Sequence, residues 1–237
     1  MKKYSLTKNK IEVFGKTLFQ IKAEMSFGSI SKGELGGYIE KEENLSMDGN
    51  AWVSGDAKVF GNARVYGDAK VFGNARVFGD ARVLGNARVY GDAKVFGNAR
   101  VFGDARVLGN ARVYGDAKVL GNAWVYGDAR VFGNACVYGN ACVYGDARVF
   151  GDAKVFGNAR VFGDAWVSAK AEFTRGCFIG GDDSGKITDI TEKTGSNYWK
   201  YQYVLGDYEI RPIEETPTTE QEAIELLKKN GYKIIKE

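Results

Sequence analysis

The sequence predicts a mainly β protein whose central half is a solenoid of short, stacked strands. Val recurs every six residues from Val53 to Val167, twenty times without a gap. Ala recurs with the same period from Ala51 to Ala165. Repetition at a short fixed period is typical of solenoids, because each unit buries its apolar side chains only by stacking on its neighbours.

The repeating unit has the pattern V-[FYL]-G-[DN]-A-[RK], as in Val59 to Arg64. Six residues is not a helical period, and a Gly in every unit would cost a helix about 1 kcal/mol each time. Arg-Val-Phe instead suits a three-residue strand, in which Val points inward and its two neighbours point outward. Gly followed by Asp or Asn favours a corner, because these residues most easily adopt positive φ. The small Ala then fits inside that corner.

Strand and corner, repeated three times, predict a triangular coil of 18 residues and therefore a parallel β-helix. Val and Ala fill its interior, while Arg, Lys and the aromatic residues face outward. Asp and Asn alternate along most of the array, so carboxylates in neighbouring coils seldom lie over one another and repel; Asp128 over Asp146 is the expected exception. A calcium-binding β-roll is the alternative solenoid, but its nine-residue unit does not match a period of six.

Both flanks of the solenoid, which we assign to residues 47–171, differ from the repeat in composition. Met47 is expected in the Val position one unit upstream, and Ala171 with Phe173 form a fading last unit. Residues 1–46 predict an N-terminal β cap with strands at 11–14, 18–23 and 27–30. Residues 172–237 predict a small C-terminal α+β cap, with strands at 187–193, 198–205, 208–213 and 232–235 and a helix at 220–229.

The repeat resembles the left-handed β-helix of the hexapeptide-repeat acyltransferase superfamily over about half of the chain. This resemblance implies a left-handed coil and a homotrimer. The leader segments Gly33–Glu40 and Glu43–Ser46 add a similarity to YdcK-like hexapeptide proteins of bacteria and phages, which are often labelled acetyltransferases. That label rests on the fold, and a fold does not determine a function.

Acyltransferases of this superfamily use a histidine as general base, and this sequence contains no histidine. The resemblance therefore transfers no catalytic residue, and a non-enzymatic protein is favoured over an acyltransferase that works without histidine. The lack of histidine and of a CxxC spacing also argues against a metal site. Gly180–Ile187 approaches a phosphate-binding loop, but Ile187 replaces the required hydroxyl and Asp182 and Asp183 would repel phosphate, so we interpret it as a polar turn.

One outer face carries an uninterrupted basic column from Lys58 to Arg148 and beside it an aromatic column from Phe60 to Phe150. Arg and aromatic rings together can bind planar anions through charge and stacking. The candidate ligand-binding residues are Arg76, Lys94, Arg112, Arg130, Phe78, Phe96, Tyr114 and Phe132. The alternative is that these apolar columns are subunit interfaces. The modest net charge of +3 disfavours extended nucleic-acid binding.

The expected function is an oligomeric, non-enzymatic scaffold or binding protein without a cofactor. It is expected to bind copies of itself and a small anionic, nucleotide-like ligand in grooves between subunits. A self-assembling filament is a further alternative. Three cysteines, Cys136, Cys142 and Cys177, are too few for a disulfide framework and predict free thiols in a reducing compartment. With no secretory signal or membrane-spanning run, we expect a cytoplasmic protein. The resemblance to YdcK-like proteins suggests that a phage encodes it.

Overall fold

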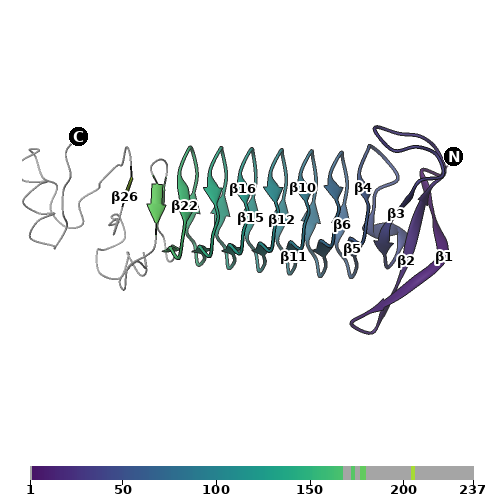
Figure 1. The fold of residues 1–237 in the computed structure, drawn as a ribbon, viewed down its shortest axis with the longest axis horizontal. Coiled ribbons are helices and arrows are strands. Elements are labelled where there is room, and N and C mark those ends of the chain that lie inside the picture. Colours follow the sequence, from purple (N-terminus) through teal and green to yellow (C-terminus); the bar gives the residue numbers. More distant parts are fainter. Residues whose placement is uncertain (1, 168–171, 174–176, 180–203, 206–237) are drawn as a thin grey trace, which may run out of the picture.

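The computed structural model describes residues 2–167, 172–173, 177–179 and 204–205. Together they form a rod of stacked coils with a long hairpin at the N-terminal end (Figure 1). The predicted mainly β class and the parallel solenoid are both confirmed, with about seven strands stacked on each face of the coil. No helix in the described part is long and apolar enough to cross a membrane.

Three sheets run along the rod, and each receives one strand from every coil. The ten-stranded sheet contains β1 (Tyr4–Val13), β2 (Lys16–Ala23), β3 (Leu35–Ile39), β5 (Lys58–Val59), β8 (Arg76–Val77), β11 (Lys94–Val95), β14 (Arg112–Val113), β17 (Arg130–Val131), β20 (Arg148–Val149) and β23 (Trp166–Val167). The nine-stranded sheet contains β4 (Trp52–Val53), β7 (Lys70–Val71), β10 (Arg88–Val89), β13 (Arg106–Val107), β16 (Trp124–Val125), β19 (Cys142–Val143), β22 (Arg160–Phe162), β25 (Cys177–Ile179) and β26 (Val204–Leu205). The seven-stranded sheet contains β6 (Arg64–Val65), β9 (Arg82–Val83), β12 (Arg100–Val101), β15 (Lys118–Val119), β18 (Cys136–Val137), β21 (Lys154–Val155) and β24 (Glu172–Phe173).

The interior of the rod is made of the two residues that the repeat places there. Every Val from Val53 to Val167 and every Ala from Ala51 to Ala165 is fully buried. Successive coils are joined by backbone hydrogen bonds, such as Lys94 N to Ala111 O at 2.9 Å and Phe96 N to Val113 O at 3.0 Å. The expected 18-residue coil is confirmed by the pairing of Val95 with Val113.

The coil strands are shorter than predicted. Nearly all of them contain two residues, Arg-Val or an equivalent pair, and only β22 includes the aromatic residue that follows. The aromatic residue still donates its N–H to the next coil, but the following Gly already turns the chain. Gly97, for example, has φ +69°, and a Cβ there would lie 3.0 Å from the backbone N of Gly115 in the next coil. Glycine is therefore required both for its positive φ and for close coil stacking.

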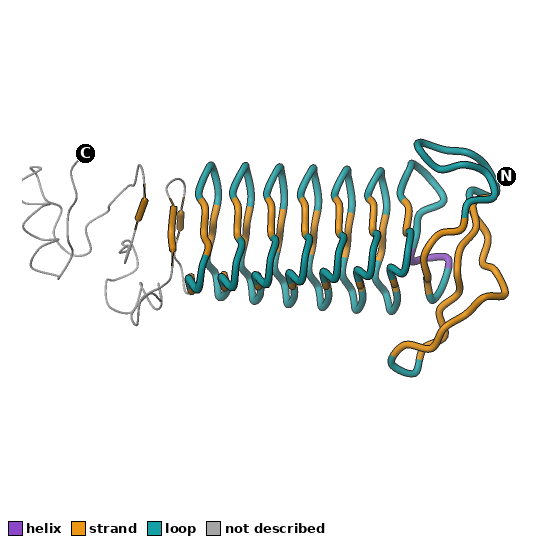
Figure 2. The backbone as a smooth tube through the Cα atoms, in the orientation of Figure 1, coloured by secondary structure: helices purple, strands orange, loops and turns teal. Residues whose placement is uncertain are grey.

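An antiparallel hairpin covers the N-terminal end of the rod (Figure 2). β1 pairs with β2, β2 pairs with β3, and β3 joins the parallel stack through β5. The hairpin tip is a two-residue turn in which Phe14 has φ +50° and Gly15 has φ +72°. The side chains of Tyr4 and Ile21 are fully buried and belong to the same core as the coils, so the hairpin closes this end of the apolar interior.

The first coil begins earlier than the sequence indicates. Ile39 pairs with Val59 and Leu45 pairs with Val65, so these two residues take the inward positions of the coil. The expectation that Met47 holds the Val position is wrong: Met47 is only partly buried and packs against the core. The reason is that the paired positions in this coil are twenty residues apart instead of 18, which places two extra residues in the segment that follows Leu45.

The short helix η1 (Glu42–Asn44) lies in this first coil. Its last residue, Asn44, is fully buried, and its Nδ2 donates to Gly61 O at 3.0 Å and to Ala63 O at 2.8 Å. Its Oδ1 accepts from Lys41 N at 3.0 Å. These bonds satisfy the buried amide and join the first coil to the second.

At the other end, Phe173 is fully buried and pairs with Val155, as expected for a fading last unit. The predicted strand 198–205 is represented by β26, which pairs antiparallel with β25. The other predicted elements of the C-terminal cap, including the helix at 220–229, lie outside the described residues.

Candidate functional site

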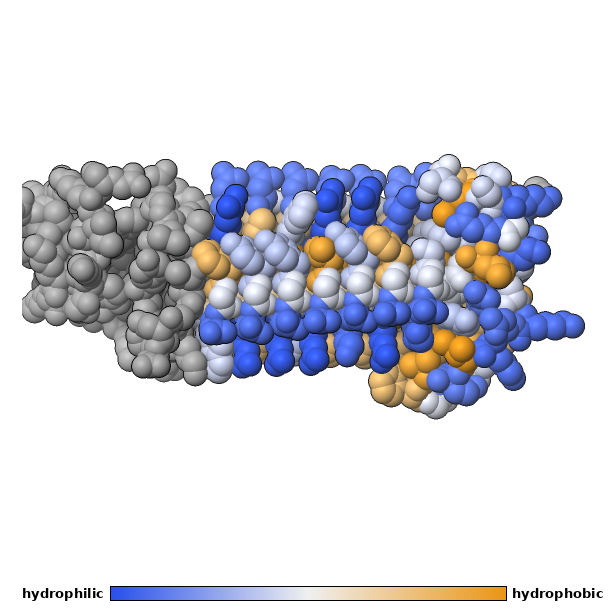
Figure 3. All heavy atoms as spheres, viewed as in Figure 1, coloured by the Kyte–Doolittle hydropathy of each residue, from blue (hydrophilic) through white to orange (hydrophobic). Residues whose placement is uncertain are grey.

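Each face of the coil presents three parallel ladders of side chains to the solvent. Asp or Asn, then Arg or Lys, then an aromatic residue or Leu alternate along the chain with the buried Ala and Val, as in Asp92 to Phe96. Because all three residues keep the same place in every coil, each ladder runs the length of the rod. Figure 3 shows the result as rows of hydrophilic side chains along the axis, with less polar rows between them.

The predicted ligand-binding residues do come together on the ten-stranded face. Arg76, Lys94, Arg112 and Arg130 occupy neighbouring strands in register. The aromatic residues beside them form a continuous stack, in which Phe96 lies 4.9 Å from both Phe78 and Tyr114 between ring centroids, with interplanar angles of 1° and 3°. The stack extends over six rings: Phe60, Phe78, Phe96, Tyr114, Phe132 and Phe150.

This stacking changes what the aromatic ladder can do. Both faces of each inner ring are in contact with the neighbouring rings of the stack. At its two ends, the rings of Phe14 and Trp166 contact the stack at interplanar angles of 43° and 80°. Only ring edges remain for another molecule, so a planar ligand cannot stack there as the sequence interpretation supposed. The rings are also half-buried or buried by their own contacts, which weakens the argument that they need a subunit interface to leave water.

The basic ladder of the ten-stranded face is crowded. Of its six members only Arg112 is exposed; the others are half-buried. Burial lowers the pKa of Lys58, and the neighbouring Arg76 lowers it further, while Asp56 opposes the change. The Nζ of Lys58 donates to the backbone O of Asp56 at 2.7 Å. Charge repulsion between neighbouring coils therefore acts on Lys58.

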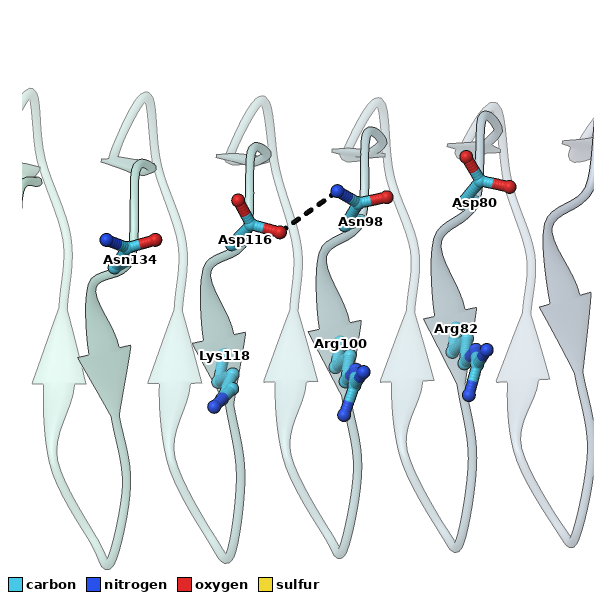
Figure 4. A pocket seen from close by; sticks show the side chains of 7 residues that line it. All are labelled: Asp80, Arg82, Asn98, Arg100, Asp116, Lys118 and Asn134. Atoms are coloured by element: carbon cyan, nitrogen blue, oxygen red, sulfur yellow. Dashed lines mark hydrogen bonds between the residues drawn. The ribbon is translucent and has the colours of Figure 1, made fainter.

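A groove of about 460 Å³ lies instead on the seven-stranded face (Figure 4). It crosses β9, β12 and β15 in the middle of the rod, and its lining side chains are all exposed. One edge is formed by the Asp/Asn ladder and the other by the basic ladder, as the figure shows. The lining residues are Asp80, Arg82, Asn98, Arg100, Asp116, Lys118 and Asn134.

The Asp/Asn edge of the groove is organised into hydrogen-bonded pairs. Asn98 Nδ2 donates to Asp116 Oδ1 at 3.0 Å. The same bond joins Asn62 to Asp80 at 3.1 Å and Asn134 to Asp152 at 2.9 Å. Because Asp and Asn alternate, each of these pairs contains one amide donor and one carboxylate instead of two carboxylates, and a hydrogen bond takes the place of their repulsion. A carboxylate has room for about four donors, so Asp80 and Asp116 keep most of their acceptor capacity for a ligand.

The basic edge consists of Arg82, Arg100 and Lys118. Ion pairs in the described part of the chain join Lys2 to Glu42, Lys16 to Glu40 and Lys154 to Glu172, and none involves this edge. Within the described part of the chain, these three cationic side chains also donate no hydrogen bond to the protein. Their donors are free for a ligand.

The uninterrupted basic and aromatic columns of the ten-stranded face made that face the predicted site. The seven-stranded face has Leu84 and Leu120 in its third ladder and Cys136 in its basic ladder. All three faces carry Asp/Asn and basic ladders, so residue types alone do not distinguish them. The long basic side chains are exposed here, whereas on the ten-stranded face all but Arg112 are half-buried. Side-chain packing decides this difference in conformation, and the exposed conformation opens the groove.

Other candidates from the sequence contribute no site. Cys136 and Cys142 lie on different faces, as expected, and both are free. Asp128 and Asp146 do lie in adjacent coils, as the pairing of Arg130 with Arg148 requires. Among the described residues no group of three or more Cys, Asp or Glu side chains is arranged to hold a metal ion. The loop Gly180–Ile187 lies outside the described residues.

Comparison with known proteins agrees with the solenoid fold. A family model, the YdcK beta solenoid repeat, matches residues 99–115, 111–127, 123–139 and 153–169. A search of curated proteins gives no significant match. Over these segments of the rod, the chain is similar to the YdcK beta solenoid repeat.

Proposed function

We propose that this protein is a non-enzymatic scaffold whose outer ladders bind other molecules without transforming them. The observation that carries the proposal is the uniformity of the outer surface. The same three outward positions recur in every coil, and they form parallel rows of like residues rather than a cluster of unlike groups. Catalysis needs a nucleophile or base and an oriented partner that converge on one reacting atom. Parallel rows suit repeated contacts with an extended or multivalent partner.

The absence of histidine from the sequence supports the same proposal. An acyltransferase on this scaffold would have to use a corner Asp as its base, and several of these carboxylates already accept hydrogen bonds from an Asn one coil away. The matching test is incubation with acetyl-CoA. We expect no release of free CoA. We also expect no rise in melting temperature: a ligand that binds only the folded state raises it, and we expect acetyl-CoA not to bind. Steady release of CoA with any acceptor amine would refute the proposal.

We also propose that the scaffold is a homotrimer, as the hexapeptide resemblance implies, with a small anionic ligand held between subunits by Arg76, Lys94, Arg112 and Arg130. The supporting observation is that these cations have no carboxylate partner within the described part of the chain. The proposed setting is a reducing cytoplasm, suggested by the free thiols, and a phage genome, suggested by the leader segment. Native mass spectrometry after gentle purification tests the assembly. The expected result is the mass of three chains plus a reproducible small adduct, and a monomer without an adduct would contradict it.

A filament is the weaker alternative. Axial assembly requires the open core of one rod to stack on the next, and the hairpin β1–β2 covers the core at the N-terminal end. Electron microscopy of the purified protein distinguishes the two arrangements, because a filament grows with concentration and a trimer keeps a fixed size.

A further inference from the structure

The groove on the seven-stranded face has two edges with opposite hydrogen-bonding character. Arg82, Arg100 and Lys118 offer only donors, while Asp80 and Asp116 offer only acceptors. Asn98 and Asn134 offer both. A ligand that fills the groove must therefore present acceptors along one side and donors along the other. It must also repeat these groups, because equivalent residues recur once per coil.

The spacing of the groups sets a second condition. Adjacent strands lie about 4.8 Å apart, and the stacked rings on the ten-stranded face repeat at 4.9 Å between centroids. A ligand lying along the axis meets one basic and one Asp or Asn side chain at each such step. A linear chain of pyranose rings carries polar groups on every ring, so a chain that lies along the axis meets the side chains of several coils.

Charge excludes the simplest polyanions. A nucleic acid or polyphosphate offers acceptors to the basic edge, but its backbone has few donors, and its charges would lie close to Asp80 and Asp116. A neutral glycan offers hydroxyl donors but leaves the three cations unpaired. A chain of uronic acids has both groups on every ring: a carboxylate for Arg or Lys, and hydroxyls that donate to Asp or Asn.

We propose that this groove binds a linear acidic polysaccharide of the uronic-acid class. This proposal rests on the function proposed above, since it names a partner of the scaffold. Carboxylates of the bound chain pair with the basic edge, Arg82, Arg100 and Lys118, and its hydroxyls donate to Asp80, Asn98 and Asp116. The binding stretch ends toward the C-terminus at Cys136, because the thiol interrupts the basic ladder and the next cation, Lys154, is already paired with Glu172.

The first test is the binding of a fluorescently labelled galacturonic acid hexamer to the full chain, measured by fluorescence anisotropy. The groove variant is Arg82→Gln with Arg100→Gln and Lys118→Gln. The solenoid provides a matched control, Lys70→Gln with Arg88→Gln and Arg106→Gln, which removes the same number of positive charges from equivalent positions of the nine-stranded face. We expect the groove variant to lose at least about tenfold in affinity, as for the loss of several charge-assisted hydrogen bonds, and the control to change less than about threefold. Equal losses in both variants would show binding by diffuse charge and would overturn the proposal.

The second test examines the acceptor edge, where the sign of the effect is decisive. The variant Asp80→Ala with Asp116→Ala removes two negative charges from the groove. If hydroxyls donate to these carboxylates, the hexamer binds more weakly to this variant, although the groove has become more positive. Unchanged or tighter binding would overturn the proposal, because it would mean that the ligand meets the basic edge alone.

Two further ligands complete the comparison. A neutral galactose hexamer and a single-stranded oligonucleotide of similar length are both expected to bind at least about tenfold more weakly than the uronate hexamer. An oligonucleotide that binds as tightly would favour a nucleic-acid partner and contradict the proposal. Circular dichroism of each variant checks that the solenoid is intact. Acetyl-CoA turnover and native mass are measured separately, so a failed groove test leaves the result on the scaffold function readable by itself.

Discussion

The closeness of successive glycine corners predicts that Gly97→Ala destabilises the rod through two separate effects. Gly97 has φ +69°, in the left-handed region, and an L-residue there costs about 1–2 kcal/mol. The new Cβ would also lie 3.0 Å from the N and 3.2 Å from the O of Gly115. Those atoms move only if the coils separate, yet Asn98 N donates to that same oxygen at 2.8 Å. Overpacking of this kind costs about 1–3 kcal/mol more.

The chain offers a control that isolates the two effects. Gly15 has φ +72°, but a Cβ there meets nothing within 4 Å. Gly15→Ala is therefore expected to cost only the backbone strain, about 1–2 kcal/mol, whereas Gly97→Ala should cost about 2–5 kcal/mol in total. The difference between the two variants measures the resistance of the coils to separation.

Urea unfolding followed by far-UV circular dichroism gives the free energy of unfolding for each variant. A solenoid can also open locally, because each repeat contacts only its neighbours. Hydrogen exchange of the amides beside each substitution therefore accompanies the urea measurement. Equal destabilisation by the two substitutions would refute the reasoning, since it would mean that the corners tolerate a methyl group between coils.

Three other perturbations follow from the same structure. Val95→Ala removes about two methyl equivalents from a fully buried site and should lower the free energy of unfolding by about 2–3 kcal/mol in urea titrations; a loss below about 1 kcal/mol would mean that the coil collapses around the gap. Asn98→Asp places a carboxylate between Asp80 and Asp116 and removes the 3.0 Å hydrogen bond from the Asn98 amide. We expect the free energy of unfolding to fall by about 1–2 kcal/mol at low salt, and thermal melts should show a smaller loss as salt is added. Burial lowers the pKa of Lys3 from 10.5 to about 8, although nearby carboxylates oppose this change. Between pH 8 and 10 the unfolded chain therefore binds more protons than the folded chain, and the free energy of unfolding should rise with pH by up to about 1.4 kcal/mol per pH unit. The variant Lys3→Met should remove this dependence on pH.

The solenoid could be predicted from the repeat alone. A strict period of six, with Val and Ala in fixed places, leaves few ways to bury both residues, and the structure buries every one of them from Ala51 to Val167. The coil length of 18 and the separation of Cys136 and Cys142 onto different faces follow from the same repetition. Alternation of Asp and Asn was also readable as a device against carboxylate repulsion, and the hydrogen bond from Asn98 to Asp116 shows how it works.

Irregular segments escaped prediction because they have no repeat to constrain them. Leu45 rather than Met47 lies beside Val65, since the first coil is two residues longer and its register is set by pairing across coils. The hairpin tip contains Phe14 at φ +50°, where propensity favours Gly, Asn or Asp.

The candidate site was decided almost entirely by tertiary structure. All three faces carry similar residue types, and the sequence favoured the face with the unbroken columns. Stacking of rings such as Phe96 and Tyr114 then takes up the ring faces that a ligand was expected to use. On the seven-stranded face, exposed side chains such as Arg100 leave a groove beside the Asp/Asn ladder. Residue type fixes which groups are available, but the packing of long side chains between coils fixes which of them remain open to a partner.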